Sequence, residues 1–365
     1  QDLIAVSSII RPGVAKSGMM QEYIVRFHEP GRIIFLHPIM QELLSETFGI
    51  MVYQEDVMKV VHHIGGFDLF ESDQLRRLMT GKNKNRDELL ALMDRFMAHT
   101  RMAGIDTSLA QELWRQIESF SGYSFCKAHS ATYAAESMQS LYLKTHFPIE
   151  FMVAVINNRG GFYPMEVYIR ELVRLGASIE MPCLVHSSWM TRISYGKVYL
   201  GFSHIKGVTR QTGEALLSLR SRSDHIRKLD QVIGLVAAAQ LDLLIEAGVF
   251  RTLEKVKSKL LFERLLLSNA AHVGQLQIFA TPNFRYQADV DQTEVMEAQI
   301  QMRLLGFTLS TPFILFESLP YASLHLLRNK GTGENVMIIG YYVLEKPVTT
   351  DDGRHMCFAT WYDQD

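Results

Sequence analysis

The sequence predicts a mainly α-helical protein with a small β segment near its C-terminal end. Between residues 38 and 157, apolar side chains recur at the three- and four-residue spacing of helices. Between residues 160 and 267, glycine turns separate further helical stretches. After residue 333 the pattern changes to two runs of β-branched and aromatic residues joined by an Asp-Gly turn, which is typical of a hairpin.

Composition narrows the class of protein. The chain has 365 residues, of which 47% are apolar and 21% are charged, so it is globular and long enough for two or three domains. Its net charge of −2 means that any contact with DNA must come from a local concentration of basic residues. The three cysteines are far apart and predict neither a disulfide framework nor a zinc site. We expect a cytoplasmic protein without a membrane partner, because no apolar run reaches about 18 residues and no signal pattern is present.

The first 36 residues mix short apolar runs with turn residues and show no clear helical period. The helical block then begins at Pro38, which suits the first turn of a helix. Its helices are separated by breaks at Gly65-Gly66, Gly104, Ser121-Gly122 and Phe147-Pro148.

The second helical region opens with a helix through Val167–Leu175 that ends at Gly176. A short strand is expected at Val198–Phe202, and a helix at Gln211–Leu219. The glycine turns at 205–209 and 244–250 lie beside helices, where backbone N–H groups can bind a DNA phosphate without reading sequence.

Lys206, Gly207 and Gly248 are therefore the candidate DNA-binding residues of these two turns. Thr209 and Phe250 stand where a second glycine would complete the usual hairpin pattern. A purely structural turn between helices is the alternative at both places.

Residues 270–333 are expected to form a connector that holds one amphipathic helix near Glu294–Leu305. Strands are predicted over Val336–Leu344 and His355–Tyr362.

Residues 119–134 are the most informative segment. They combine Ser, Gly, aromatic rings, Lys127 and His129 immediately before an apolar helical run. A helix start with a lysine and a histidine beside it favours a phosphate ligand. In the alternative interpretation, Ser130 is only an N-cap, Lys127 is solvated and His129 bonds a nearby carbonyl.

This segment resembles the signature of the fingers in bacterial replicative DNA polymerases, the polymerase III alpha subunits and their error-prone relatives. Two further blocks, Thr47–Met58 and Asp73–Lys82, match in the same order. The forms Met79-Thr80-Gly81-Lys82 and Ile156–Tyr163 are closer to the error-prone, repair-associated branch.

The resemblance implies four domains. These are a palm-proximal segment with the fingers at 1–157, a tandem helix-hairpin-helix domain at 158–268, the connector at 269–333 and the start of an OB-fold at 334–365. It leaves two roles open for the block Tyr53-Gln54-Glu55, contact with the substrate or support of the helices around the site, and we favour support.

The nucleotide site is implied to consist of basic residues that stabilise the triphosphate and the leaving pyrophosphate. The candidates are Arg76, Arg77 and Lys82, joined by Lys127, His129 and Arg11. Val14 stands where most relatives have the second proline of the Arg11-Pro12-Gly13 block.

A basic window from Arg76 to Arg101 holds seven basic residues against three acidic ones. We expect Lys84 and Arg86 within it to contact DNA, whereas the alternative is a solvated helix face.

The catalytic carboxylates of such polymerases lie in the palm, upstream of the region where this chain begins. The full enzyme is implied to use Mg²⁺, with its ligands outside this chain. The pairs Asp289/Asp291 and Asp363/Asp365 have a similar spacing but are expected to be solvated loop acids. The chain thus looks like an interior slice of a longer enzyme, inactive in DNA synthesis on its own.

The expected partners are primer-template DNA, a dNTP, and the sliding clamp and other replication or repair subunits. A different class remains open, namely a non-catalytic DNA-binding or accessory module. A third possibility is an unrelated helical enzyme, but this hypothesis does not account for three motif matches in the same order.

Overall fold

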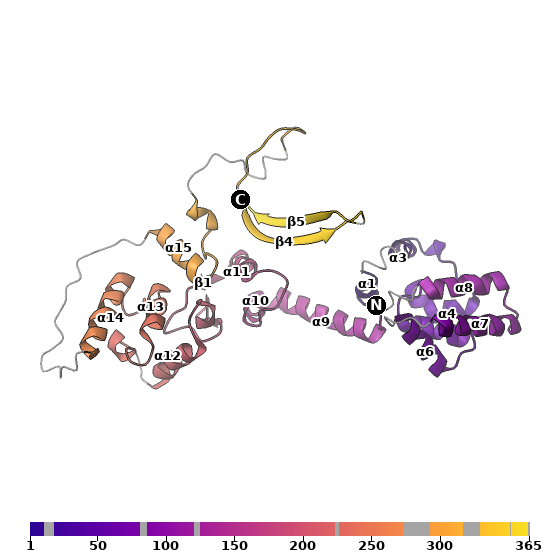
Figure 1. The fold of residues 1–365 in the computed structure, drawn as a ribbon, viewed down its shortest axis with the longest axis horizontal. Helices are drawn as coiled ribbons and strands as arrows, with labels where there is room; N and C mark the ends of the chain where they lie inside the picture. The colour runs from indigo at the N-terminus through magenta and orange to yellow at the C-terminus, as the bar shows by residue number, and fades with distance from the viewer. Residues whose placement is uncertain are drawn as a thin grey trace. The chain divides into compact units, whose positions relative to one another are not determined.

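The computed structural model describes residues 1–10, 18–80, 86–119, 125–222, 226–272, 293–316, 329–350 and 352–363. The chain forms two compact units, residues 1–142 and residues 143–365. Helices dominate both units (Figure 1), which confirms the predicted mainly α fold class.

The first unit is a helical bundle. Its helices and 3₁₀ turns are α1 (Asp2–Ile9), α3 (Met19–His28), η1 (Pro30–Arg32), α4 (Pro38–Leu44), η2 (Ser45–Thr47), α5 (Gln54–His63), α6 (Leu69–Thr80), α7 (Arg86–Met102), α8 (Thr107–Ser119) and the first part of α9 (Lys127–His146).

One core holds this bundle together. Five consecutive helices each supply a side chain with no exposed surface to it, namely Leu44, Val60, Leu75, Phe96 and Leu113. Burying such side chains stabilises a fold by about 1.5–3 kcal/mol each relative to leaving them in water.

The predicted helix boundaries are confirmed at three positions. Pro38 is the first residue of α4. Gly66 and Gly104 adopt left-handed backbone angles, φ +64° and +75°, in the turns that follow α5 and α7. At Gly66 a Cβ atom would lie 2.1 Å from the His99 ring, so only glycine fits this turn.

The expectation for the first 36 residues was incomplete, because α1 and α3 lie there. The helix α1 is apolar on nearly every side, so it offers no polar face from which a helical period could be read. Gly18, one of the turn residues of this region, is the N-cap of the short helix α3.

The second unit carries the remaining elements. They are the end of α9, α10 (Pro148–Asn157), α11 (Met165–Arg174), β1 (Ser178–Glu180), β2 (Arg192–Ser194), β3 (Lys197–Tyr199), η3 (Phe202–His204), α12 (Arg210–Arg222), η4 (Leu229–Gln231), α13 (Ala238–Glu246), α14 (Lys257–His272), α15 (Glu294–Leu304), η5 (Pro312–Leu315), β4 (Tyr341–Thr349) and β5 (His355–Tyr362).

A small three-stranded sheet of order β1-β3-β2 contributes to one of the two clusters of buried side chains in this unit. Strand β3 pairs parallel with β1 and antiparallel with β2, so that Val198 lies between Ile179 and Ile193. Its neighbour Leu200, with no exposed surface, belongs to the cluster that α10 and α11 contribute to.

Several predicted elements of this unit are confirmed. The helix α11 ends at Arg174 and is followed by Gly176 with φ +84°. The strand expected at 198–202 is present as the shorter β3. The helix expected at 211–219 is α12, longer at both ends.

The first predicted strand of the C-terminal hairpin was placed too early. It begins at Tyr341 instead of Val336. Tyr341 pairs with Tyr362, the last residue of β5, so no partner residue of β5 remains for the positions before it. Among the described residues after 333, this antiparallel pair (Figure 1) is the β structure present, and the OB-fold stays a prediction.

The connector contains a packed helix. The helix α15 starts at the predicted Glu294 and ends one residue before the predicted Leu305, and its last residue, Leu304, is buried in the core around α12 and α13. Phe307, just beyond it, is buried in the core around α10 and α11. Residues 293–309 are therefore a structural part of the second unit.

Candidate nucleic-acid interface

The start of α9 is fixed by a residue far away in the sequence. Phe125 forms a single β bridge with Tyr53, and its carbonyl accepts the N–H of Gln54 at 3.0 Å. The backbone N–H of Lys127 donates to both carboxylate oxygens of Glu55, at 2.9 and 3.1 Å, and the Cys126 thiol donates to Glu55 at 3.2 Å. Because a helix N-terminus carries partial positive charge, Glu55 is the anion that this helix start binds here.

The ammonium group of Lys127 also contacts a carboxylate. Its Nζ atom lies 2.5 Å from Glu46 Oε2 and 5.4 Å from the centre of the Tyr53 ring. The Lys127 side chain keeps 32% of its surface exposed. Both groups that the sequence assigned to a phosphate, the helix start and the lysine, thus contact protein carboxylates in this structure.

His129 faces solvent in a row of rings. Its imidazole lies 4.9 Å from the Phe125 ring and 4.5 Å from the Tyr133 ring, measured between centroids. Ser130 is not the N-cap that the alternative interpretation supposed. It is buried one turn inside α9, where its hydroxyl lies 2.5 Å from that of Ser8.

Arg76 and Arg77 share one acid. Their Nε atoms donate to the two oxygens of Asp73, at 2.8 and 2.7 Å. The hydrogen bond from Arg76, reinforced by Arg77, lowers the pKa of the Asp73 carboxyl. Arg76 also donates to Gln54 Oε1 at 3.3 Å and is 28% exposed, whereas Arg77 is 74% exposed.

The turn before α5 is held by Asp56. Its Oδ2 atom accepts the backbone N–H groups of Val52 and Tyr53, each at 3.0 Å, and its side chain is buried. Burial raises the pKa of Asp56 to about 6, although these two hydrogen bonds oppose the shift. Burial, with nearby acids, also raises the pKa of the Tyr53 phenol.

The three sequence blocks therefore meet at one place in the first unit. Residues 53–55 contact the start of α9 through Tyr53 and Glu55, and contact α6 through Gln54 and Arg76. The sequence did not reveal Glu46, which pairs with a lysine 81 positions away, and no local pattern could have pointed to it.

Three candidates, Arg11, Lys82 and Lys84, lie outside the described residues. Arg86 is the exposed first residue of α7. Elsewhere in the basic window, Arg95 forms an ion pair with Glu71 of α6.

The first glycine turn of the second unit is bound by Gln240 of α13. Its amide accepts the Thr209 N–H at 2.8 Å and donates to the Gly207 carbonyl at 2.7 Å. Gly207 has φ +87°, a conformation that favours glycine. Thr209 in turn caps α12, because its hydroxyl accepts the Thr212 N–H at 3.3 Å.

Lys206 lies at the C-terminal end of α15. Its backbone N–H donates to the Leu304 carbonyl at 2.7 Å. A Cβ atom on Gly306 would lie 2.7 Å from Lys206 Nζ, which places the ammonium group beside the last turn of the helix. Cations are favoured there by the helix dipole.

At the second glycine turn, Gly248 has φ +73° and ends α13, with the Val249 N–H donating to the Leu244 carbonyl at 3.0 Å. Phe250, in place of a second glycine, has no exposed surface and is part of the core. Lys257, at the start of α14, contacts Glu297 of α15 at 2.6 and 2.8 Å.

Within the described parts of the chain, no group of three His, Cys, Asp or Glu side chains is arranged to hold a metal ion. The acids Asp289, Asp291 and Asp365 lie outside those parts. Likewise, no helix among the described residues has the length and apolar character needed to cross a bilayer.

Two family models match parts of the chain. Residues 1–117 match the family model of the bacterial DNA polymerase III alpha subunit finger domain. Residues 176–260 match the model of the helix-hairpin-helix motif, which covers both glycine turns.

The whole chain is similar to proteins named DNA polymerase III subunit alpha. It is 28% identical to that of Treponema pallidum (strain Nichols), over 33% of the relative's length. It is 26% identical to those of Staphylococcus epidermidis and Staphylococcus aureus (strain MRSA252), over 35% of their length. The chain thus spans about one third of the length of these relatives.

Proposed function

We propose that this chain is part of a DNA-directed DNA polymerase of the bacterial polymerase III alpha type. Its first unit would grip the triphosphate of an incoming dNTP, and its helix-hairpin-helix region would contact the backbone of the primer-template. The observation that carries the proposal is the contact between Gln54 and Arg76, both in the region that matches the finger domain model, and the contact of the same block with the start of α9 at Lys127, just beyond that region.

The ion pairs of the basic residues suit a nucleotide that binds and is then released. Arg77 and Lys127 each contact one carboxylate, at Asp73 and Glu46, and both side chains reach solvent. A triphosphate carries more negative charge than a carboxylate, so it can replace these partners during the reaction and release them afterwards. The two carboxylates hold the cations in position before the nucleotide binds. They take the cations back after the reaction, so the nucleotide is not bound permanently.

The rest of the reaction belongs to the complete enzyme in this proposal. The metal-binding carboxylates and Mg²⁺ would come from the palm, and the fragment alone would not synthesise DNA. We assign the enzyme to the error-prone, repair-associated branch on the blocks Met79–Lys82 and Ile156–Tyr163. The sliding clamp and other replication or repair subunits are its proposed partners, in the cytoplasm.

The test is steady-state nucleotide incorporation by a complete polymerase that carries this segment, with Arg77→Ala and Arg76→Ala variants. We expect kcat/KM for dNTP to fall about tenfold or more in each, because each variant loses a charge-assisted contact, while the Kd for primer-template stays within about twofold. Arg115→Ala is the matched control, since Arg115 is 69% exposed and pairs with Glu112 within its own helix.

Unchanged nucleotide kinetics in both variants would refute the triphosphate role. If primer-template binding persisted in that case, the accessory DNA-binding module would become the better interpretation.

A further inference from the structure

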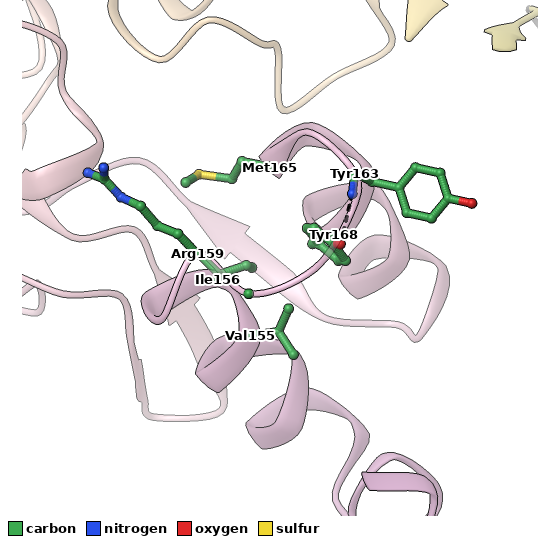
Figure 2. A pocket seen from close by; sticks show the side chains of 7 residues that line it. Val155, Ile156, Arg159, Tyr163, Met165 and Tyr168 are labelled. Atoms are coloured by element: carbon green, nitrogen blue, oxygen red, sulfur yellow. Dashed lines mark hydrogen bonds between the residues drawn. The ribbon is translucent and has the colours of Figure 1, made fainter. Parts of the chain in front are cut away.

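A cavity of about 310 Å³ lies at the turn between α10 and α11. Its walls are mostly apolar and come from Val155 and Ile156 of α10 and Met165 and Tyr168 of α11, with Arg159 and Tyr163 of the turn at its rim. In Figure 2, Arg159 and Met165 extend on one side of the turn, and the Tyr163 ring points away on the other. None of the contacts described above uses this cavity.

Arg159 stands where a glycine would fit better. The helix α10 ends with the Gly160 N–H donating to the Val155 carbonyl at 3.0 Å, a pattern that places the intervening residue in the left-handed region. Arg159 has φ +49°, in the left-handed region that strains the backbone of a residue other than glycine. A strained backbone at a residue that lines a cavity points to a role for its side chain.

The polar groups near Arg159 in the described part of the chain already have partners of their own. Asn157 pairs with both backbone groups of Thr191 at 2.8 Å, and the Thr191 hydroxyl lies 2.7 Å from His204 Nε2. Burial, reinforced by Arg159, lowers the pKa of His204 to about 4, so the imidazole is neutral near pH 7. The acid of α11 next to the cavity, Glu166, is buried and accepts hydrogen bonds from Arg170 and Tyr341.

The other end of the rim is aromatic and exposed. Phe162 and Tyr163 keep 73% and 49% of their surface in solvent. The Tyr163 backbone is fixed, because its N–H donates to the Tyr168 hydroxyl at 3.1 Å. Gly161 permits this approach, since a Cβ atom there would lie 1.8 Å from the same hydroxyl. An exposed ring on a fixed backbone is suited to stacking on a nucleobase.

We infer that this cavity binds one unpaired nucleotide of single-stranded DNA. The base enters between the Val155 and Met165 side chains, Arg159 binds its phosphate, and the neighbouring base stacks on Tyr163. An arginine, an apolar slot and an exposed ring in this order match a phosphate, its base and the neighbouring base along a single strand. This inference rests on the proposed DNA-polymerase function, and it adds a site for the unpaired strand to it.

The test uses the full 365-residue chain and fluorescence anisotropy of a short labelled oligothymidylate. In Arg159→Gly we expect binding to weaken about tenfold, while the midpoint of urea unfolding rises because the left-handed strain is relieved. Arg159→Lys keeps the charge and should lose less affinity. Tyr195→Gly is the matched control, because Tyr195 also has φ +49° but lies outside the cavity.

A second probe tests the base. The same oligonucleotide with abasic sites should bind the wild-type chain about tenfold more weakly, because it has no bases to insert or stack. Equal affinity of both probes would overturn the inference. So would an Arg159→Gly variant that is more stable but binds oligothymidylate as well as the wild type, which would leave an aromatic or aliphatic side chain of a partner protein as the better occupant.

The two proposals fail separately. Unchanged nucleotide kinetics in both Arg76→Ala and Arg77→Ala would refute the triphosphate role in the proposed function, whatever the anisotropy shows. If the wild-type chain binds a primer-template duplex but the cavity variants leave single-strand binding unchanged, only the inference about the cavity fails.

Discussion

The carboxylate of Glu55 binds the backbone N–H of Lys127 with both oxygens, at 2.9 and 3.1 Å, across 72 positions of sequence. An acidic side chain of the protein thus occupies the position that a phosphate would favour at the start of α9. The strength of this contact determines how firmly the signature segment is attached to the bundle.

We predict that Glu55→Gln destabilises the first unit by about 1–2 kcal/mol, because a charged acceptor at a helix N-terminus becomes a neutral one. Urea unfolding followed by circular dichroism measures the change. Glu42→Gln is the control, since Glu42 is exposed on α4. Equal midpoints for the two variants would show that Glu55 does not anchor α9.

Asp56 makes the stability of the first unit depend on pH. Its folded pKa of about 6 lies above the ordinary 3.8, so the folded state binds the proton more tightly than the unfolded state. Its stabilising contribution is therefore complete below about pH 4 and is lost as the pH rises through 6. The loss is at most about 3 kcal/mol, because one pKa unit corresponds to about 1.4 kcal/mol.

The measurement is urea unfolding of the wild type and of Asp56→Asn at several pH values between 4 and 7.5. Asparagine can accept the same two N–H groups without a charge, so the variant should gain stability relative to the wild type as the pH rises through this window. A difference that stays constant with pH would contradict the assignment.

Lys206→Ala should have two effects if the first glycine turn contacts DNA. The affinity for DNA should fall uniformly across sequences, and the slope of log K against log salt should decrease by about one. Stability should also drop by about 0.5 kcal/mol, because the ammonium group leaves the end of α15. Lys206→Arg should preserve the slope. A stability loss with an unchanged slope would mean that Lys206 only caps α15.

Gly207→Ala should destabilise the second unit by about 1–2 kcal/mol through its positive φ, with a further loss from crowding. The added Cβ atom would lie 3.1 Å from Leu243 Cδ1. Gly234→Ala separates the two causes, because Gly234 has nearly the same φ, +88°, but nothing within 4 Å of such an atom. Thermal unfolding of both variants should show the greater loss at Gly207, and equal losses would exclude the crowding.

Local patterns in the sequence were sufficient for much of the fold. Pro38, the Phe147-Pro148 break and Gly176 each mark a helix limit through their own backbone chemistry, and all three limits are confirmed. The start of β4 could not be predicted in this way, because it depends on which residues β5 supplies as partners. The apolar helix α1 lacked the polar contrast on which a periodicity argument depends.

The site was less predictable than the fold. The sequence identified Arg76, Arg77, Lys127 and His129 as a group of interest, and residues 53–55 as their support. It could not show that Glu46 and Glu55 contact the lysine and the helix start, because both contacts join residues more than 70 positions apart. Whether these basic residues bind a nucleotide stays a prediction.

The bridge between Tyr53 and Phe125 has a consequence for the order of folding. It closes a loop that contains α5, α6, α7 and α8, and the entropy cost of such a long closure is repaid only after those helices have packed. We therefore expect helix α9 to dock late, so that Lys127 and His129 take up their positions only when the bundle beneath them is complete.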